Sequence, residues 1–132
     1  MTGKIPNPTE GVLKHFTIKD SERHKAKIFP KEMPDSKACE LSYRLIGESE
    51  RYFLLEVEPK TGRYHQIRAQ LSYIGCPIKG DIKYNWPRTN EDGSIHLHAR
   101  SVTFMHPVKK TPITVMAPVP DTDAVWKYFA SL

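Results

Sequence analysis

Residues 52–75 read YFLLEVEPKTGRYHQIRAQLSYIG, and the change of pattern within this stretch decides the fold. Residues 52–57 are apolar on both faces until their end, which predicts a strand in the centre of a sheet. A proline and a glycine then break the strand, and Thr61 is placed to cap a helix. The spacing predicts that helix over 64–74, with Gly75 as its C-terminal stop.

The predicted helix carries one apolar stripe. Ile67, Leu71 and Ile74 are spaced four and three residues apart, so they share a face that we expect to be buried. His65 and Arg68 are three residues apart and lie on a neighbouring face. The stripe fixes the rotation of the helix, and Arg68 is therefore expected to point toward a cleft instead of bulk solvent.

The residues before this stretch predict its partner strand. Residues 38–45 alternate apolar and polar side chains, which is typical of a strand with one buried face. A polar turn at 47–50 follows, so the two strands should form a hairpin. The first 37 residues contain four prolines and few periodic apolar runs. We expect from them a peripheral strand or two with long loops.

Shorter elements are predicted beyond the helix. A loop rich in glycine, proline and asparagine covers 75–94, and strands are predicted over 95–105 and 112–117. A final helix should start at Asp121 or Thr122. It carries apolar residues at helical spacing, namely Val125, Tyr128, Phe129 and Leu132. The class predicted is α+β, with a mixed, mostly antiparallel sheet and flanking helices.

Length and composition describe one globular domain. The chain has 132 residues, of which 39% are hydrophobic and 27% charged, enough for a single core and too few for two. No apolar run is long enough to cross a membrane and no secretion signal is visible, so we expect a cytoplasmic protein with no membrane partner. The two cysteines, Cys39 and Cys76, exclude a disulfide scaffold and a four-cysteine zinc site.

Positive charge is concentrated in the middle of the chain. Residues 60–110 hold nine lysines and arginines against three acidic residues, whereas residues 1–59 hold ten of each. The formal net charge of +5 therefore comes from the middle segment. Such a segment favours a polyanionic partner, most commonly RNA or DNA, although a solvated basic face without a partner has the same composition.

The start of the predicted helix concentrates hydrogen-bond donors. Arg63, His65, Gln66 and Arg68 stand in its first two turns, and donors with positive charge at a helix N-terminus make an anion site. Arginine adds a planar fork that suits phosphate or carboxylate. The residues alone therefore predict a phosphate-binding helix start.

Three motifs in order resemble one family. Residues 61–84 read TGRYHQIRAQLSYIGCPIKGDIKY, followed by LHA at 97–99 and F-x-H-P at 104–107. The series resembles the C-terminal signature of the RluA-type pseudouridine synthases of the RluA/RsuA superfamily, and the resemblance covers residues 38–120. It implies an enzyme that isomerises uridine to pseudouridine in ribosomal or transfer RNA. Such an enzyme flips the base into a pocket and uses no cofactor or metal.

The resemblance also implies roles for particular residues. Arg68 matches the arginine that pairs with the family's catalytic aspartate, and that charge would keep the carboxylate ionised and aimed. Ile67 matches an apolar position that lines the uracil pocket. Arg63, His65 and Gln66 belong to the same motif, and we expect them to hydrogen-bond the turn or the RNA backbone.

The family's catalytic aspartate lies upstream, in a His-Arg-Leu-Asp motif that this chain does not contain. The resemblance therefore implies one partial catalytic domain over 1–132, with a variable stretch 1–37, a family-like core 38–120 and a C-terminal helix 121–132. We expect the chain alone to be inactive, with RNA and the missing N-terminal half of the domain as partners. The alternative is a non-catalytic RNA-binding module derived from the family.

Other polar residues have plainer interpretations. Asp81 follows Gly80, and we expect it to close a tight turn or pair with a basic neighbour instead of acting as a nucleophile. His96 and His98 have the spacing of a metal pair on a strand, and His65 could be a third ligand. Strand imidazoles more often hydrogen-bond to backbone and no carboxylate stands at ligand spacing, so we expect no metal.

Overall fold

The computed structural model describes residues 1–121 and 123–131, which form helices and antiparallel sheets as the predicted α+β class requires. The elements in chain order are β1 (Glu10–Asp20), β2 (Lys25–Phe29), β3 (Lys37–Glu48), β4 (Phe53–Pro59), α1 (Gln66–Tyr73), the short helix η1 (Ile82–Tyr84), β5 (Ser101–Met105), β6 (Pro112–Met116) and α2 (Ala124–Ala130). They divide into two compact units, Met1–His96 and Leu97–Leu132. That both units belong to one catalytic domain stays a prediction.

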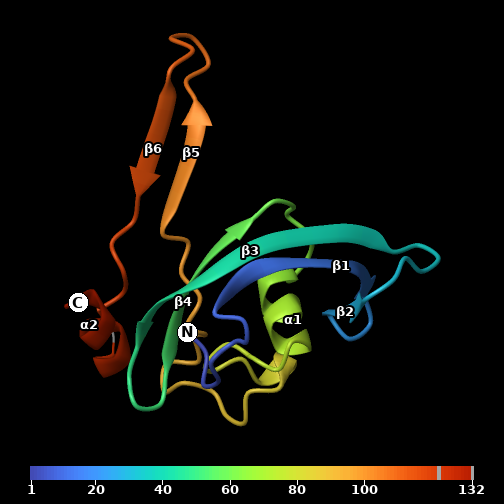
Figure 1. The fold of residues 1–132 in the computed structure, drawn as a ribbon, viewed down its shortest axis with the longest axis horizontal. Helices are drawn as coiled ribbons and strands as arrows, with labels where there is room; N and C mark the ends of the chain where they lie inside the picture. Colours follow the sequence, from blue (N-terminus) through green and yellow to red (C-terminus); the bar gives the residue numbers. More distant parts are fainter. Residues whose placement is uncertain (122, 132) are drawn as a thin grey trace. The chain divides into compact units, whose positions relative to one another are not determined.

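The first unit is a four-stranded antiparallel sheet in the order β2-β1-β3-β4, with α1 packed on one face (Figure 1). The predicted hairpin is confirmed as β3 and β4, in which Tyr43 lies opposite Val57. An irregularity between Leu45 and Gly47 shifts the register near the turn. The hairpin brings the end of β4 to the turn that leads into α1.

The sequence predicted the positions of two strands wrongly. β1 is an inner strand flanked by β2 and β3, not a peripheral one. Its core-facing residues include His15 and Thr17, and these polar side chains hide the alternation that usually marks a buried strand. β4, predicted to be central because it is apolar on both faces, is an edge strand. Part of its outer edge is covered by an isolated bridge between Thr2 and Phe53.

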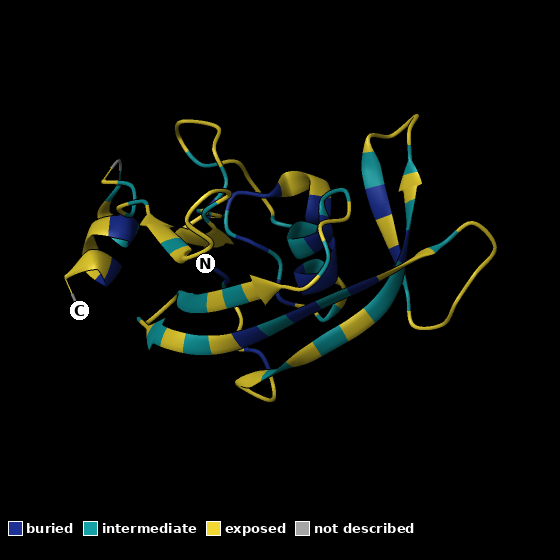
Figure 2. Cartoon of the chain, turned by 90° about the horizontal axis from the view of Figure 1, so that it is seen from above, coloured by how far each residue is buried: buried dark blue, intermediate teal, exposed yellow. Residues whose placement is uncertain are grey.

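The core of the first unit lies between the sheet and α1. One buried cluster joins β2, β3, α1 and η1 and consists of Ala26, Ile28, Cys39, Ala69 and Tyr84. Figure 2 shows buried and exposed residues alternating along the strands, as expected for a sheet with one covered face. Both cysteines are free and buried, Cys76 like Cys39. None of the helices in the described part of the chain has the length and apolar character that a membrane crossing needs.

The helix α1 is shorter than predicted and presents a different face to the core. Its buried residues are Gln66, Ala69, Gln70 and Leu71. The predicted stripe is therefore wrong for Ile67 and Ile74, which are only half-buried, and right for Leu71. Gly75 follows the helix at a φ of 85°, which confirms the predicted stop.

The second unit contains a two-stranded ribbon of β5 and β6 and the helix α2. The strand predicted over 95–105 is wrong for its first six residues, because β5 begins at Ser101. His96 instead donates its backbone N–H to the Lys79 carbonyl at 3.0 Å, within the first unit. The strand predicted over 112–117 corresponds to β6.

The start of α2 also differs from the prediction. Asp123 caps it, with Oδ1 accepting from the Trp126 N–H at 2.9 Å, and Asp121 does not. Phe129 is buried as predicted, whereas Tyr128 is exposed and Trp126 takes the second buried position. The predicted roles of Thr122 and Leu132 fall on residues outside the described part of the chain.

Candidate functional site

A buried ion pair joins α1 to the segment that follows it. Arg68 Nε and Nη2 donate to the two carboxylate oxygens of Asp81, each at 2.8 Å. The Asp81 side chain is 1% exposed and that of Arg68 22%, so the pair is largely shielded from water. The hydrogen bond to Asp81 raises the pKa of Arg68 above its ordinary value. Asp81 therefore pairs with a basic neighbour, as predicted.

A tight turn places Asp81 opposite Arg68. Gly80 precedes it at a φ of 87°, and a Cβ there would lie 2.5 Å from Asn90 Nδ2, so the backbone must be glycine. The Asp81 N–H donates to the Ile78 carbonyl at 3.0 Å, and the Asp81 carbonyl accepts from the Tyr84 N–H at 3.2 Å. The same turn therefore determines the positions of both the Asp81 carboxylate and the Tyr84 ring.

Three rings surround the ion pair. His65 precedes α1 in a left-handed conformation, with φ 51° and ψ 26°. Its ring stacks on Tyr64 with centroids 3.9 Å apart and meets Tyr84 edge-on. The Arg68 guanidinium carbon lies 5.0 Å from the centroid of Tyr84, within cation–π range. A left-handed histidine is uncommon, and here it directs the ring toward Tyr84.

A chain of hydrogen bonds engages one ring nitrogen of His65. The Tyr84 hydroxyl accepts from the Ala26 N–H at 2.8 Å, and its oxygen lies 2.7 Å from His65 Nδ1. His65 Nδ1 is therefore engaged inside the protein, and Nε2 is the ring nitrogen left for a partner from outside. Burial lowers the pKa of His65 below its ordinary value, and the charges of Arg68 and two lysines lower it further. We therefore expect neutral His65 at physiological pH.

The turn before α1 is held by buried polar contacts. Gln66 Oε1 accepts from the Thr61 hydroxyl at 2.6 Å and the Arg63 N–H at 3.0 Å, and Gln66 Nε2 donates to the Glu40 carbonyl at 3.0 Å. Thr61 is thus not the helix cap, contrary to prediction, but a link between Gln66 and β3. Arg63 Nε donates to the Ala38 carbonyl at 2.9 Å. Gln66 thus hydrogen-bonds the turn, whereas the Arg63 side chain binds β3. Contact of either residue with RNA stays a prediction.

Cations outside the predicted set border the rings. Lys19 Nζ lies 4.3 Å from the Tyr64 centroid, and Lys25 Nζ lies 5.5 Å from that of Tyr84. Lys83 Nζ donates to the His24 carbonyl at 3.0 Å. Sequence reasoning did not single these lysines out, and no local pattern marks Lys19, which reaches the site through the pairing of β1 with β2.

The structure does not assemble the three-histidine arrangement. In residues 1–121 and 123–131, no group of three histidine, cysteine, aspartate or glutamate side chains could hold a metal ion. His98 belongs to the second unit, where its Nε2 lies 3.2 Å from the Ala117 carbonyl oxygen. His65 is held by Tyr84, as described above.

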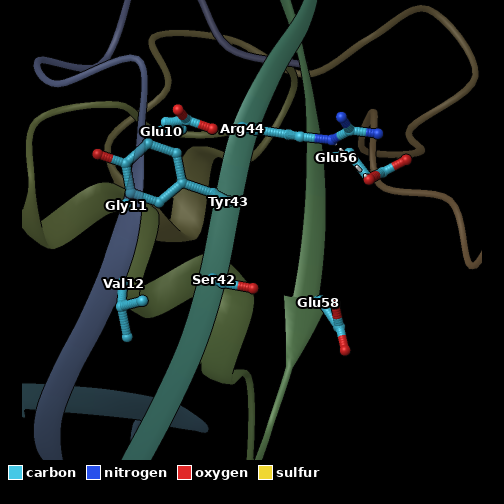
Figure 3. A pocket seen from close by; sticks show the side chains of 8 residues that line it. All are labelled: Glu10, Gly11, Val12, Ser42, Tyr43, Arg44, Glu56 and Glu58. Atoms are coloured by element: carbon cyan, nitrogen blue, oxygen red, sulfur yellow. Dashed lines mark hydrogen bonds and ion pairs between the residues drawn. The ribbon is translucent and has the colours of Figure 1, made fainter.

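A pocket of about 340 Å³ lies apart from this site, along β1, β3 and β4 (Figure 3). Arg44 and Glu56 form an ion pair there at 2.9 Å. The complete lining is Glu10, Gly11, Val12, Ser42, Tyr43, Arg44, Glu56 and Glu58. Three glutamates against one arginine make this pocket unsuitable for a polyanion.

Comparison with known proteins gives the family. A family model described as RNA pseudouridylate synthase matches residues 2–73. RNA pseudouridine synthase 1 of Oryza sativa subsp. japonica is 42% identical over 77 residues, which cover 55% of this chain and 22% of that relative. The tRNA pseudouridine synthase C of Salmonella typhi is 38% identical over 79 residues, covering 54% of this chain and 30% of that relative.

A solved structure supports the same fold. Human RNA Pseudouridylate Synthase Domain Containing 4 superposes with a TM-score of 0.73 at 22% identity, covering 98% of this chain and 59% of that one. The chain therefore spans only part of the length of the relatives it matches. Since the family model covers more than half of the 132 residues, this chain belongs to the RNA pseudouridylate synthase family.

Proposed function

We propose that this chain is part of an enzyme that isomerises uridine to pseudouridine in RNA. Family membership supports the reaction, and the name of the Salmonella typhi relative makes transfer RNA the first substrate to test, with ribosomal RNA second. The observation that carries the proposal is the partly buried Arg68 fork, held by Asp81 beside the His65 and Tyr84 rings. Two buried free cysteines fit the reducing cytoplasm as its location.

Arg68 is suited to hold a second carboxylate. Asp81 occupies Nε and Nη2, and the Nη1 amino group has no hydrogen bond in the described part of the chain. An arginine close to a nucleophilic aspartate keeps it ionised and orients it by charge-assisted hydrogen bonds. We propose that this aspartate comes from the missing N-terminal half of the domain, with Ile67, next to Arg68 in α1, lining the uracil pocket.

The alternative function, a non-catalytic RNA-binding module, rests on a different observation. The lysines around Tyr64 and Tyr84 belong to this chain, whereas the His-Arg-Leu-Asp motif does not. A module of this kind would keep RNA affinity and have no turnover with any partner. The two functions therefore differ in one result: adding a segment that carries the His-Arg-Leu-Asp motif restores turnover to the enzyme and not to the binding module.

Tritium release from transfer RNA labelled at uridine C5 tests the proposal. The 132-residue chain alone should release no tritium above a blank, because covalent or glycal chemistry at the ribose requires the aspartate. A separately produced segment of a relative that carries the motif should restore release. The Arg68→Met chain with the same segment, assayed where circular dichroism verifies that it is folded, should lose release by about 100-fold or more.

Two results would contradict the proposed function. Turnover by the chain alone would require another nucleophile and would overturn the assignment of the aspartate to an upstream segment. RNA binding without turnover, in a mixture where the two polypeptides form a complex, would favour the binding module.

A further inference from the structure

The lysines around His65 differ from two lysines of the sheet that are paired with glutamates. On the sheet, Lys14 lies 3.9 Å from Glu40 and Lys60 lies 2.8 Å from Glu58, so positive and negative charges there are matched. Lys19 and Lys83 form no ion pair with a carboxylate within residues 1–121 and 123–131. The surface around the rings therefore keeps the positive charge of Lys19 and Lys83.

The carboxylates nearest in sequence to these lysines have partners of their own. Asp81, two residues before Lys83, is held by the Arg68 fork. Asp20, next to Lys19, accepts from the Glu22 and Arg23 N–H groups at 3.1 and 3.2 Å and lies 3.7 Å from Arg23 Nε. Neither carboxylate neutralises the lysines through a direct contact.

His65 adds a directed donor to this charge. Its Nδ1 is engaged with the Tyr84 hydroxyl, so Nε2 is the ring nitrogen left to contact a ligand. Nε2 has no hydrogen-bond partner in the described chain, and it is not among the buried atoms that lack one, so it faces solvent. Tyr64 holds the ring in place by stacking at 3.9 Å. The lowered pKa of His65 agrees with a ring surrounded by cations.

We propose that His65 Nε2–H, Lys19 and Lys83 bind phosphate groups of the RNA backbone. This inference rests on the proposed function, since it names the part of the RNA that this surface contacts. His65 donates one hydrogen bond to a phosphate oxygen, and Lys19 and Lys83 neutralise that phosphate and its neighbours. The Ala26–Tyr84–His65 hydrogen-bond chain positions the donor. The surface lies beside Arg68, so it would hold the strand next to the reacting nucleotide.

Salt-dependent RNA binding tests the inference, with fluorescein-labelled single-stranded RNA as the probe at about pH 7.5 and from about 50 to about 200 mM KCl. The double variant Lys19→Gln/Lys83→Gln should reduce the slope of log affinity against log salt by about 0.7 for each phosphate that it no longer neutralises. Lys14→Gln/Lys60→Gln is the matched control, because it removes the same charge from two lysines that are already paired with glutamates. It should leave the slope unchanged.

A third variant separates the histidine from the lysines. His65→Phe keeps a ring to stack on Tyr64 and removes the Nε2 donor. Affinity should fall about tenfold, in the range of a hydrogen bond to a charged group, while the salt slope stays as in the parent, because a neutral donor releases no counterion. Circular dichroism of each variant would verify that the fold is retained.

The outcomes distinguish this inference from the proposed function. Equal slopes for the Lys19/Lys83 and Lys14/Lys60 variants, with tight and salt-dependent binding by the parent chain, would overturn the phosphate site and leave the proposed function standing. A His65→Phe variant with unchanged affinity would remove His65 from the site. Parent binding that is indifferent to salt would count against RNA as the partner and so against the proposed function itself.

Discussion

Asp81 keeps a carboxylate inside the protein at 1% exposure, and Arg68 is its ion-pair partner. A buried pair of this kind adds little to stability over an apolar pair of the same shape, but losing one member leaves an uncompensated charge. The bidentate geometry, with both contacts at 2.8 Å, gives the guanidinium one fixed orientation. At this scale the pair therefore holds the Arg68 guanidinium in one orientation through two of its nitrogens.

Arg68→Met should lower the free energy of unfolding by about 3–5 kcal/mol, because it leaves Asp81 buried without its partner. The double variant Arg68→Met/Asp81→Asn should recover much of that loss, since the amide carries no charge. Urea unfolding of the parent, both single variants and the double variant gives the coupling energy. A single-variant cost below about 1 kcal/mol would show that Asp81 is solvated when unpaired.

Among the elements, α1 depends on the turn that precedes it. The helix begins without a side-chain cap, after a left-handed His65. Gln66 supplies the contacts that fix this start, since its amide joins Thr61, the Arg63 N–H and the Glu40 carbonyl while only 4% exposed. These contacts fix where α1 begins, and they therefore contribute to the position of Arg68.

Gln66→Ala should destabilise the chain by about 2–4 kcal/mol, because it leaves several buried donors and acceptors without partners. Arg63→Met is the comparison within the same turn. Its side-chain hydrogen bond to Ala38 is exposed, so its loss should cost about 1 kcal/mol or less. Thermal or urea unfolding measures both, and equal effects would contradict the role of Gln66 as the link between α1 and β3.

Elements defined by local pattern were predictable, and those defined by distant pairing were not. The β3–β4 hairpin, the existence of α1 and its glycine stop follow from periodicity and turn residues within about 40 positions. β1 was not predicted as an inner strand because its inward face carries His15 and Thr17. The burial of these two residues depends on β2, β3 and α1 together. β4 was misplaced because apolar residues on both faces do not specify how many neighbours a strand has.

For the site, the pairing of Asp81 with a basic neighbour follows from residue type and motif, which are local. The catalytic role of Arg68 stays a prediction. The contact of His65 with Tyr84 depends on a left-handed backbone at His65 and on a turn 19 residues later, and neither has a sequence signature of its own. Lys19 reaches the rings only through the register of β1 with β2.

For the whole molecule, three groups bind protons less readily in the folded state than in the unfolded one. Burial lowers the pKa of the Met1 amine from 8.0 to about 5, with a further contribution from Lys79. Burial also lowers the pKa of His15 and, together with nearby cations, that of His65. The stability they contribute is present above the unfolded pKa values and is lost as pH falls toward the folded ones.

The free energy of unfolding should therefore fall as the pH is lowered from about 8 to about 5. The Met1 amine alone accounts for up to about 4 kcal/mol, since each pKa unit corresponds to about 1.4 kcal/mol. Urea titrations across this range measure the effect, and a His65→Gln variant should show a shallower decline below about pH 6.5. Stability that stays constant or rises on acidification would show that these groups are solvated.

The two buried cysteines allow local opening of the first unit to be measured by thiol modification. Cys39 is 2% and Cys76 3% exposed, and burial raises the pKa of each thiol, so neither supplies an accessible thiolate to a disulfide reagent in the folded chain. Modification must wait for a fluctuation that exposes β3 or the segment after α1. The rate at which each thiol is modified therefore measures how often the structure opens locally around that cysteine. It does so at two positions and without any introduced probe.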